Sequence, residues 1–230
     1  MLNFFHLFNS MLFGSGFSGY MGWFHNFTCS FSFGVLVFVL LLLLYLIFNI
    51  DYFKNNSSEY QVGEFLCSMI PTAVLVTQMA PSLGLLYYYG LMNLDSSLTI
   101  KIAGHQWYWS YDYGCVENLE FDSYMKSSDQ LVLGDLRLLD VDSRCVVPSD
   151  INTRFCTTSS DVIHSWAVPA FSVKLDGMSG IITTFCYNFP VLGLFYGQCS
   201  EICGVNHSFM PIVVECSLIE DFSEWVSSFM

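Results

Sequence analysis

The sequence predicts an α+β membrane protein, with a two-helix transmembrane hairpin followed by a β-sandwich or small barrel. Three observations predict this class. Positions 1–50 contain no Asp, Glu, Lys or Arg, although the chain has 20 acidic and 7 basic residues in all. Two apolar runs within the first 91 residues are long enough to cross a bilayer. After residue 92, short segments rich in β-branched and aromatic residues alternate with turn residues.

The composition excludes several classes of protein. Apolar residues make up 53% of the chain and charged residues 12%, against about 25% charged in soluble proteins. This excludes disorder and disfavours a wholly soluble globule. The net charge of −13 excludes a broad nucleic-acid surface, because a polyanion would be repelled.

The first span is predicted at about residues 30–50. Phe31–Ile50 contains only two polar residues, Ser32 and Asn49, and about 20 apolar residues suffice to cross the hydrocarbon core. The preceding segment lacks the basic residues of a secretory or transit peptide, so we expect it to be mature sequence. The sequence does not predict a structure for residues 1–29.

The second span is predicted at about residues 67–91. It contains Pro71 and Pro81 and a few polar residues, which membrane helices tolerate where they pack against other protein. The alternative is a buried helical pair in a soluble domain, which the apolar first span disfavours. We therefore assign residues 1–92 to an N-terminal segment with a membrane hairpin, and expect contact with lipid.

Residues 93–230 form the predicted second domain, with a net charge of −11. A capping box from Ser217 to Glu220 predicts a short helix through Trp225. The predicted strands are Leu98–Gly104, Gln106–Tyr113, Arg144–Pro148, Asn152–Thr158, Phe171–Leu175, Ile181–Tyr187, Gly193–Gln198 and Pro211–Cys216.

Cys199, Cys203, His207 and Met210 place two thiols, an imidazole and a thioether within 12 residues. This donor set selects copper, because zinc rarely uses a thioether whereas copper electron-transfer sites accept an axial Met. A mononuclear blue-copper site takes only one Cys. Two cysteines therefore favour two coppers joined by bridging sulfurs.

A second imidazole must then come from elsewhere in the chain. The candidates are His6, His25, His105 and His164. We choose His164, which lies near a turn at a predicted strand end. Taken alone, any one of these histidines is more often a structural residue than a metal ligand.

Three segments carry a family resemblance: YGQCSEICGVNHSFMP (Tyr196–Pro211), DVIHSWAVP (Asp161–Pro169) and GHQWYWSYDY (Gly104–Tyr113). They closely resemble the cytochrome c oxidase subunit 2 family in its animal mitochondrial form, over about residues 64–225. The resemblance implies a cupredoxin-like Greek-key domain with a dinuclear copper (CuA) centre. It implies that the ligands are His164, Cys199, Cys203, His207, Met210 and the carbonyl of Glu201.

The resemblance also implies a function. Electrons would pass from cytochrome c, through Trp107, to the copper centre and then to the haem of a catalytic subunit that reduces oxygen and translocates protons. The side chain of Glu201 would bind a magnesium ion shared with that subunit. Glu64 would lie at the entrance of a proton path. The protein would be a multi-pass protein of the mitochondrial inner membrane, with its copper domain in the intermembrane space.

Acidic residues are candidates for docking a basic electron carrier, because opposite charges speed association. At Asn118, this chain departs from the acidic residue usual in the family. The candidates are Asp112, Glu117, Glu120, Asp122, Asp140 and Asp142.

Two other functions remain open. A quinol-oxidase counterpart would keep the fold without copper, but the intact cysteines and Met210 oppose it. A copper-delivery protein would need an exposed, exchangeable site, whereas a distant His164 predicts a closed one. Cysteines outside the motif are expected to be small buried apolar residues, and the sequence does not decide whether Cys145 pairs with Cys156.

Overall fold

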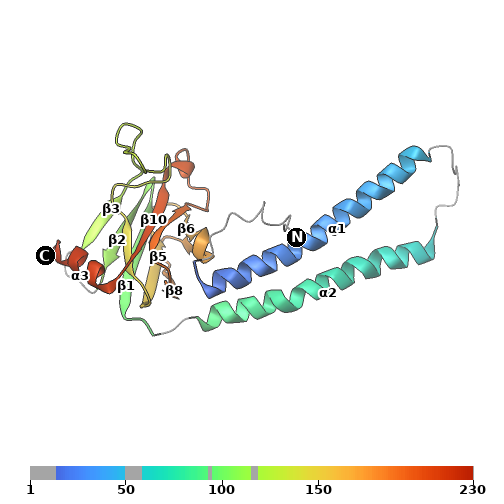
Figure 1. Cartoon of the computed structure of the whole chain (residues 1–230), viewed down its shortest axis with the longest axis horizontal. Coiled ribbons are helices and arrows are strands. Elements are labelled where there is room, and N and C mark those ends of the chain that lie inside the picture. The colour runs from blue at the N-terminus through green and yellow to red at the C-terminus, as the bar shows by residue number, and fades with distance from the viewer. Residues whose placement is uncertain (1–13, 50–58, 93–94, 115–118, 230) are drawn as a thin grey trace. The chain divides into compact units, whose positions relative to one another are not determined.

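The computed structural model describes residues 14–49, 59–92, 95–114 and 119–229. The chain divides into two compact units (Figure 1). The first is a helical hairpin within residues 20–88. The second contains all the described strands, together with residues 14–19.

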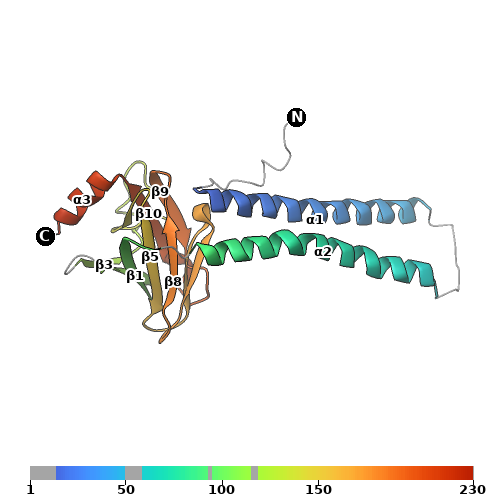
Figure 2. The same ribbon diagram turned by 90° about the horizontal axis from the view of Figure 1, so that it is seen from below.

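The hairpin consists of α1 (Gly16–Phe48) and α2 (Gln61–Leu91), which lie side by side (Figure 2). The Tyr20 and Tyr88 rings meet edge-on across it, with centroids 6.1 Å apart. The first predicted span, at about residues 30–50, overlaps α1, which begins earlier at Gly16 and ends at Phe48; residue 50 lies outside the described residues. The second predicted span lies within α2, which begins earlier at Gln61. Helices of 33 and 31 residues extend about 45–50 Å, more than the roughly 30 Å of a hydrocarbon core.

Hydroxyl groups within α2 are satisfied by the helix itself. Ser68, Thr72 and Thr77 each donate a hydrogen bond to the carbonyl four residues earlier. An unpaired polar group would be costly in lipid, so these bonds let α2 carry polar residues without a partner protein for each. Pro71 and Pro81 lie inside the same helix.

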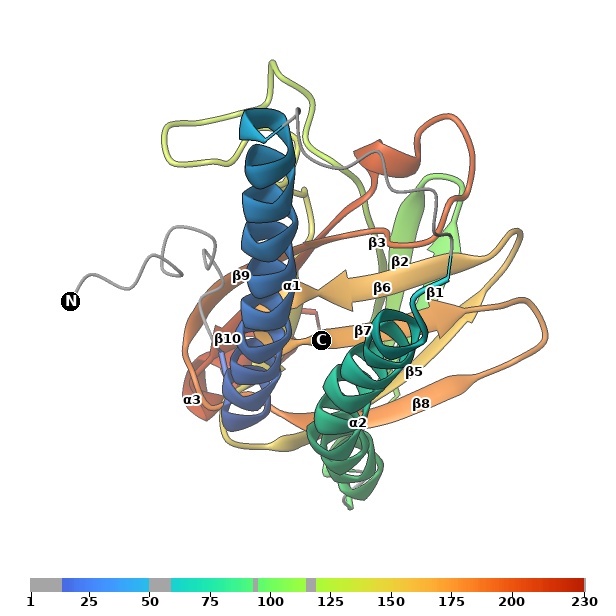
Figure 3. The ribbon, with the colours of Figure 1, turned by 90° about the vertical axis from the view of Figure 1, so that its right-hand side faces the viewer.

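The described residues of the second unit form three sheets, whose strands are seen in Figure 3. Strand order is β3-β2-β1-β5-β8 in the first, β4-β10-β9 in the second and β6-β7 in the third. Pairs β1–β5 and β4–β10 are parallel and the others antiparallel. Their bounds are β1 Leu98–His105, β2 Tyr108–Tyr113, β3 Glu120–Ser123, β4 Cys145–Pro148, β5 Asn152–Ser159, β6 His164–Val168, β7 Val173–Gly177, β8 Thr183–Asn188, β9 Gly193–Gln198 and β10 Pro211–Ser217.

The sheets enclose one aromatic-rich core. Burial alternates along β1, β2 and β5, so each presents one face to the interior. Trp109 and Tyr111 from β2, Phe155 from β5 and Trp166 from β6 are all almost completely buried in this cluster. The Trp166 indole donates a hydrogen bond to the Tyr111 hydroxyl at 3.2 Å, which satisfies a polar atom that burial would otherwise leave unpaired.

Two strands were missing from the sequence prediction. β3 is only four residues long, and β6 is buried at every position, so neither shows the alternation by which a strand is recognised. The strand predicted from Gln106 begins instead at Tyr108. Trp107 therefore lies in the β1–β2 turn and not on the strand, so the predicted start of this strand is wrong.

The predicted capping box is also wrong. Helix α3 (Ile219–Ser227) begins after Leu218, which makes no side-chain cap, because Ser217 is the last residue of β10. Cys145 and Cys156, on β4 and β5, are both free thiols. Cys145, Cys186 and Cys216 are buried as expected, but Cys67 is exposed on α2, and Cys115 lies outside the described residues.

Candidate metal centre

The sulfur-rich loop is closed by the pairing of β9 with β10. Gln198 pairs with Pro211, so Cys199 and Met210 stand directly at the two ends of the loop. His207 lies between them, at the start of the short 3-10 helix η3 (His207–Phe209). The sheet register thus brings together two donor residues that lie 11 positions apart in the sequence.

Four donor groups surround the two thiols. The Sγ atoms of Cys199 and Cys203 are 4.0 Å apart. On the Cys199 side, His164 Nδ1 lies 3.9 Å and the Glu201 carbonyl oxygen 3.3 Å from its sulfur. On the Cys203 side, His207 Nδ1 and Met210 Sδ each lie 3.5 Å from its sulfur. Each sulfur therefore has an imidazole and a weaker donor beside it.

His164 reaches this cluster from β6 and is held on several sides. Its Nε2 contacts Asp161 Oδ1 at 2.8 Å, which leaves Nδ1 facing the sulfur of Cys199. A Cβ on Gly104 would lie only 2.8–2.9 Å from the His164 ring and its Cβ, so the missing side chain makes room for the imidazole. The Trp109 ring meets it at a centroid distance of 5.9 Å.

Electrostatics set the two thiols apart. Burial raises the pKa of Cys199, but contacts with the His164 ring and the Glu201 backbone outweigh it and lower that pKa. Burial and the nearby charge of Cys199 raise the pKa of Cys203. Two neighbouring thiolates thus oppose each other, and a bound cation would relieve this repulsion. Burial lowers the pKa of His164, while Cys199 and Asp161 raise it more.

This donor set fits copper. Within the described residues, one group of three or more His, Cys, Asp or Glu side chains is close enough to hold a metal ion: His164, Cys199 and Cys203. His207 is not part of that group but touches Cys203. The thioether of Met210, 1% exposed, completes a soft set that suits copper better than zinc. The Glu201 side chain is half-buried and is not a member of the group.

Trp107 packs against the metal loop from the β1–β2 turn. A Cβ on Gly204 would lie 3.1 Å from Trp107 Cζ2 and 3.3 Å from Nε1. The ring therefore rests on the residue that follows Cys203. Sequence reasoning placed Trp107 on a strand; the structure places it on a turn beside the sulfur loop.

The predicted docking acids differ in exposure. Glu120, Asp122 and Asp142 are exposed, and Asp112 is half-buried with its Oδ2 2.6 Å from Lys101 Nζ. Asp140 is only 2% exposed, and its Oδ1 lies 3.9 Å from Arg144. The prediction that Asp140 is a docking residue is therefore wrong, because its carboxylate is buried. Glu117 and Asn118 lie outside the described residues.

Glu64 is exposed in the first turn of α2, as expected for an acid that the helix dipole favours. Two residues near the metal centre were assigned no role from sequence: Asp161 and Gln106. The signal that could have identified Asp161 is its spacing, three residues before His164 in DVIH.

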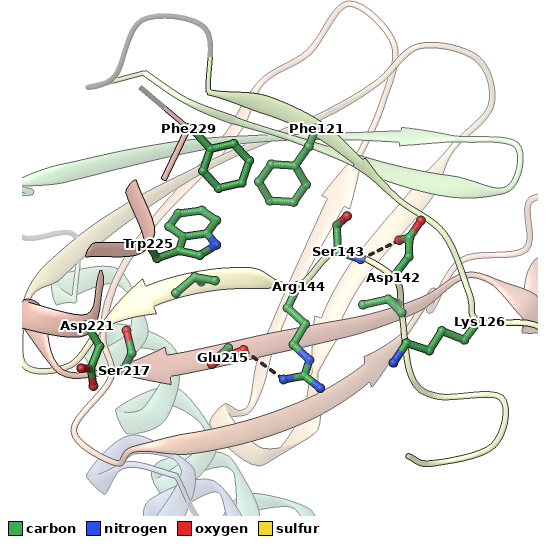
Figure 4. Close-up of a pocket in the computed structure, with 12 residues that line it drawn as sticks. Phe121, Lys126, Asp142, Ser143, Arg144, Glu215, Ser217, Asp221, Trp225 and Phe229 are labelled. Carbon is green, nitrogen blue, oxygen red and sulfur yellow. Dashed lines mark hydrogen bonds and ion pairs between the residues drawn. The ribbon is translucent and has the colours of Figure 1, made fainter. Parts of the chain in front are cut away.

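A separate cavity of about 420 Å³ lies beside α3 (Figure 4), and its lining includes none of the metal donors. Phe121, Trp225 and Phe229 form an aromatic wall, and Arg144 pairs with Glu215 on its floor at 3.1 Å. The cavity thus combines an aromatic side with a charged side that includes the Arg144–Glu215 ion pair.

A β-sandwich with a sulfur-rich metal site on the loop between its last two strands, preceded by two apolar helices, defines a membrane-anchored, cupredoxin-like copper domain. Comparisons with known proteins agree. Residues 98–217 match the family described as "Cytochrome C oxidase subunit II, periplasmic domain". Cytochrome c oxidase subunit 2 of Ascaris suum is 63% identical over 225 residues, covering 98% of this chain and 97% of that protein. The Drosophila melanogaster protein is 46% identical over 200 residues, covering 84% and 86%.

Among solved structures, the periplasmic domain of subunit II of cytochrome oxidase from Bradyrhizobium japonicum is similar, with a TM-score of 0.55 and 43% identity. The match covers 60% of this chain and 96% of that one. The chain belongs to the cytochrome c oxidase subunit II family and is a subunit of a haem-copper terminal oxidase. The predicted family and fold class are confirmed.

Proposed function

We propose that this chain receives electrons from cytochrome c at a dinuclear copper centre and relays them to the haem of the catalytic subunit. The observation that carries the proposal is the clustering of two cysteine sulfurs 4.0 Å apart, each beside its own imidazole. The copper ligands in this proposal are His164, Cys199, Glu201 through its carbonyl, Cys203, His207 and Met210.

Copper bound here would supply reversible one-electron chemistry. The protein's part is to hold the donors still: the β9–β10 pairing fixes the loop ends, and Asp161 orients the His164 ring. Burial of both sulfurs, at 6% and 4% exposure, keeps water from the ligands. Donors fixed in this way move little when the charge of the site changes, which favours fast electron transfer.

Trp107 is the proposed point where electrons enter, because its ring contacts Gly204, adjacent to Cys203. The exposed acids Glu120, Asp122 and Asp142, with Asp112, would attract a basic carrier such as cytochrome c. Such docking should weaken with salt. Glu117, which lies outside the described residues, is included among these docking residues from the sequence alone.

The remaining roles follow from the family and the placement of single residues. The Glu201 side chain would bind magnesium with the catalytic subunit, which supplies the missing ligands. Glu64, in the first turn of α2, would lie at the entrance of a proton path into the catalytic subunit. The domain division at residues 92 and 93, contact with lipid, and a place in the mitochondrial inner membrane with the copper domain in the intermembrane space belong to the same proposal. Oxygen reduction itself would occur in the catalytic subunit.

Copper analysis with electron paramagnetic resonance tests the proposal on the purified oxidase. We expect two coppers that share one unpaired electron, and loss of this signal in Cys199→Ser or Cys203→Ser. Absence of copper would favour the structural role of a quinol-oxidase subunit, and one labile copper would favour a delivery protein. An unchanged spectrum in either serine variant would refute the bridging assignment.

Two further variants test the other roles. Trp107→Ala should slow electron uptake from cytochrome c with copper content unchanged; equal loss of both would indicate a packing role. Glu64→Gln should impair turnover while copper reduction stays normal, and normal turnover would remove Glu64 from the proton path.

A further inference from the structure

Gln106 is bonded to both segments that carry the proposed copper ligands. Its side-chain Nε2 donates to the Cys203 carbonyl at 2.8 Å. Its backbone N–H donates to Asp161 Oδ2 at 2.7 Å, and the other oxygen of that carboxylate contacts His164 Nε2 at 2.8 Å. One residue in the β1–β2 turn thus connects to the Cys203 loop directly and to His164 through a single carboxylate.

The next residue in the turn is Trp107, which is half-buried and packs against the hydrophobic core of the domain. Its Nε1 is buried without a hydrogen-bond partner among the described residues, although a buried indole N–H usually has one. The ring instead rests on Gly204, where a Cβ would approach to 3.1 Å. Its position must therefore come from packing and from the backbone of the turn, which Gln106 anchors.

We infer that Gln106 is a positioning residue that holds the Trp107 ring against the Cys203–Gly204 peptide and so sets the rate of electron entry into the metal centre. This inference rests on the proposed function. Gln106 donates from its side-chain amide to the Cys203 carbonyl and from its backbone N–H to the Asp161 carboxylate. Loss of the side-chain amide therefore frees the turn from the metal loop, while the backbone bond to Asp161 remains. A neutral hydrogen bond is worth about 1 kcal/mol, or about a fivefold change in the equilibrium constant between the held and the released turn.

Two simpler roles must be separated from this one. Gln106 is exposed, so it could instead be a contact for the electron carrier. Its bond to the Cys203 carbonyl could instead serve only to keep the ligand loop folded. A docking role changes carrier affinity, and a loop-folding role changes the copper spectrum, whereas a positioning role changes neither.

The test uses the intact purified oxidase and the variant Gln106→Met, which keeps the length of the side chain but removes the N–H donor. The matched control is Gln130→Met, at an exposed glutamine in the loop after β3. Three quantities are measured: the dissociation constant for cytochrome c, the first-order rate of electron transfer within the preformed complex after flash photoreduction, and the paramagnetic resonance spectrum of copper. Hydrogen exchange of the 104–109 segment, followed by mass spectrometry, reports the turn independently of activity.

We expect Gln106→Met to lower the first-order rate about fivefold and to speed exchange in segment 104–109. The dissociation constant and the copper spectrum should match those of the unmodified oxidase and of Gln130→Met. An unchanged first-order rate, a raised dissociation constant at an unchanged rate, or an altered copper spectrum would each overturn the inference. Absence of a two-copper signal from the unmodified oxidase would overturn the proposed function as well, whereas the other failures leave it standing.

Discussion

The two imidazoles beside the sulfurs are held in different ways. His164 begins β6, is completely buried, and is fixed by Asp161, Gly104 and Trp109. His207 lies on the loop, half-buried, with its Nδ1 3.5 Å from Cys203. In the described part of the chain, we find no carboxylate bonded to the His207 ring. One imidazole is thus built into the β-sandwich, and the other follows the ligand loop.

This difference shows that one metal site can combine a ligand held rigidly by packed strands with a ligand on a loop that can adjust its position. A donor positioned by packed strands is preorganised whether or not metal is present. A donor on a loop gains its place partly from the metal itself. We therefore expect the His164 side to dominate the stability of the domain and the His207 side to respond more to metal binding.

The largest effect should come from His164→Ala. This change leaves a cavity and an unpaired Asp161 carboxylate, and should cost the metal-depleted domain about 3 kcal/mol of stability. His207→Ala, at a half-buried loop position, should cost under about 1 kcal/mol. Thermal unfolding of metal-depleted oxidase, followed by tryptophan fluorescence, measures both. Equal costs would contradict the difference described above.

Gly104→Ala should disturb His164 alone. The added Cβ would lie 2.8 Å from carbons of its ring, and overpacking of this kind costs about 1–3 kcal/mol. Gly114→Ala, at the turn residue directly after β2, is a matched control, because its Cβ would approach no atom closer than 3.9 Å. The copper spectrum should change in the first variant and not in the second. If Gly104→Ala changes neither the stability of the domain nor the copper spectrum, the close packing of Gly104 against the His164 ring is not needed to hold that ring.

Asp161→Asn should weaken metal retention about tenfold, as loss of a carboxylate behind a metal-binding His typically does. The amide oxygen can still accept a hydrogen bond from His164, but the negative charge that raises the basicity of the ring is gone. Competition with a copper chelator measures retention, and Asp122→Asn serves as an exposed control. Equal retention in both variants would show that the carboxylate charge does not matter.

The smallest effect should come from Asp176, whose carboxylate makes the stability of the domain depend on pH. Hydrogen bonds from Ser165 and Lys174 lower its pKa. A lowered folded-state pKa stabilises the domain above the unfolded value of about 3.9 and loses this contribution as the pH falls through the folded-state pKa. Asp176→Asn should cost under about 1 kcal/mol at neutral pH, since the side chain is half exposed. A variant whose deficit persists unchanged at pH 2 would contradict this explanation.

The membrane helices, the metal-binding motif and most of the strands could be predicted from the sequence, because the signals for them lie within short stretches of chain. An uncharged run of 20 apolar residues predicts a membrane helix from composition alone. The spacing of Cys199, Cys203, His207 and Met210 within one loop predicts a soft metal site, because all four donors share a short stretch of chain. Strands with alternating burial, such as β5, were predicted within a residue or two.

Other features depended on contacts between distant segments. β6 is buried on both faces, so it lacks an alternating pattern and was not predicted. Asp140 reads as a surface acid, yet it is buried beside Arg144. Trp107 reads as part of a strand, and only the position of the turn shows its ring against Gly204.

The sequence by itself determined the membrane hairpin, the class of the second domain and the chemical identity of the metal donors, since these follow from residue type and short-range spacing. The sequence also favoured His164 as the second imidazole, but only the tertiary structure shows that it lies beside Cys199 and which polar groups hold it. Those contacts depend on the pairing of β9 with β10 and on where β6 and the β1–β2 turn lie in space. Contacts between segments that are distant in the sequence produce no periodic pattern of residues, so they cannot be predicted from the sequence.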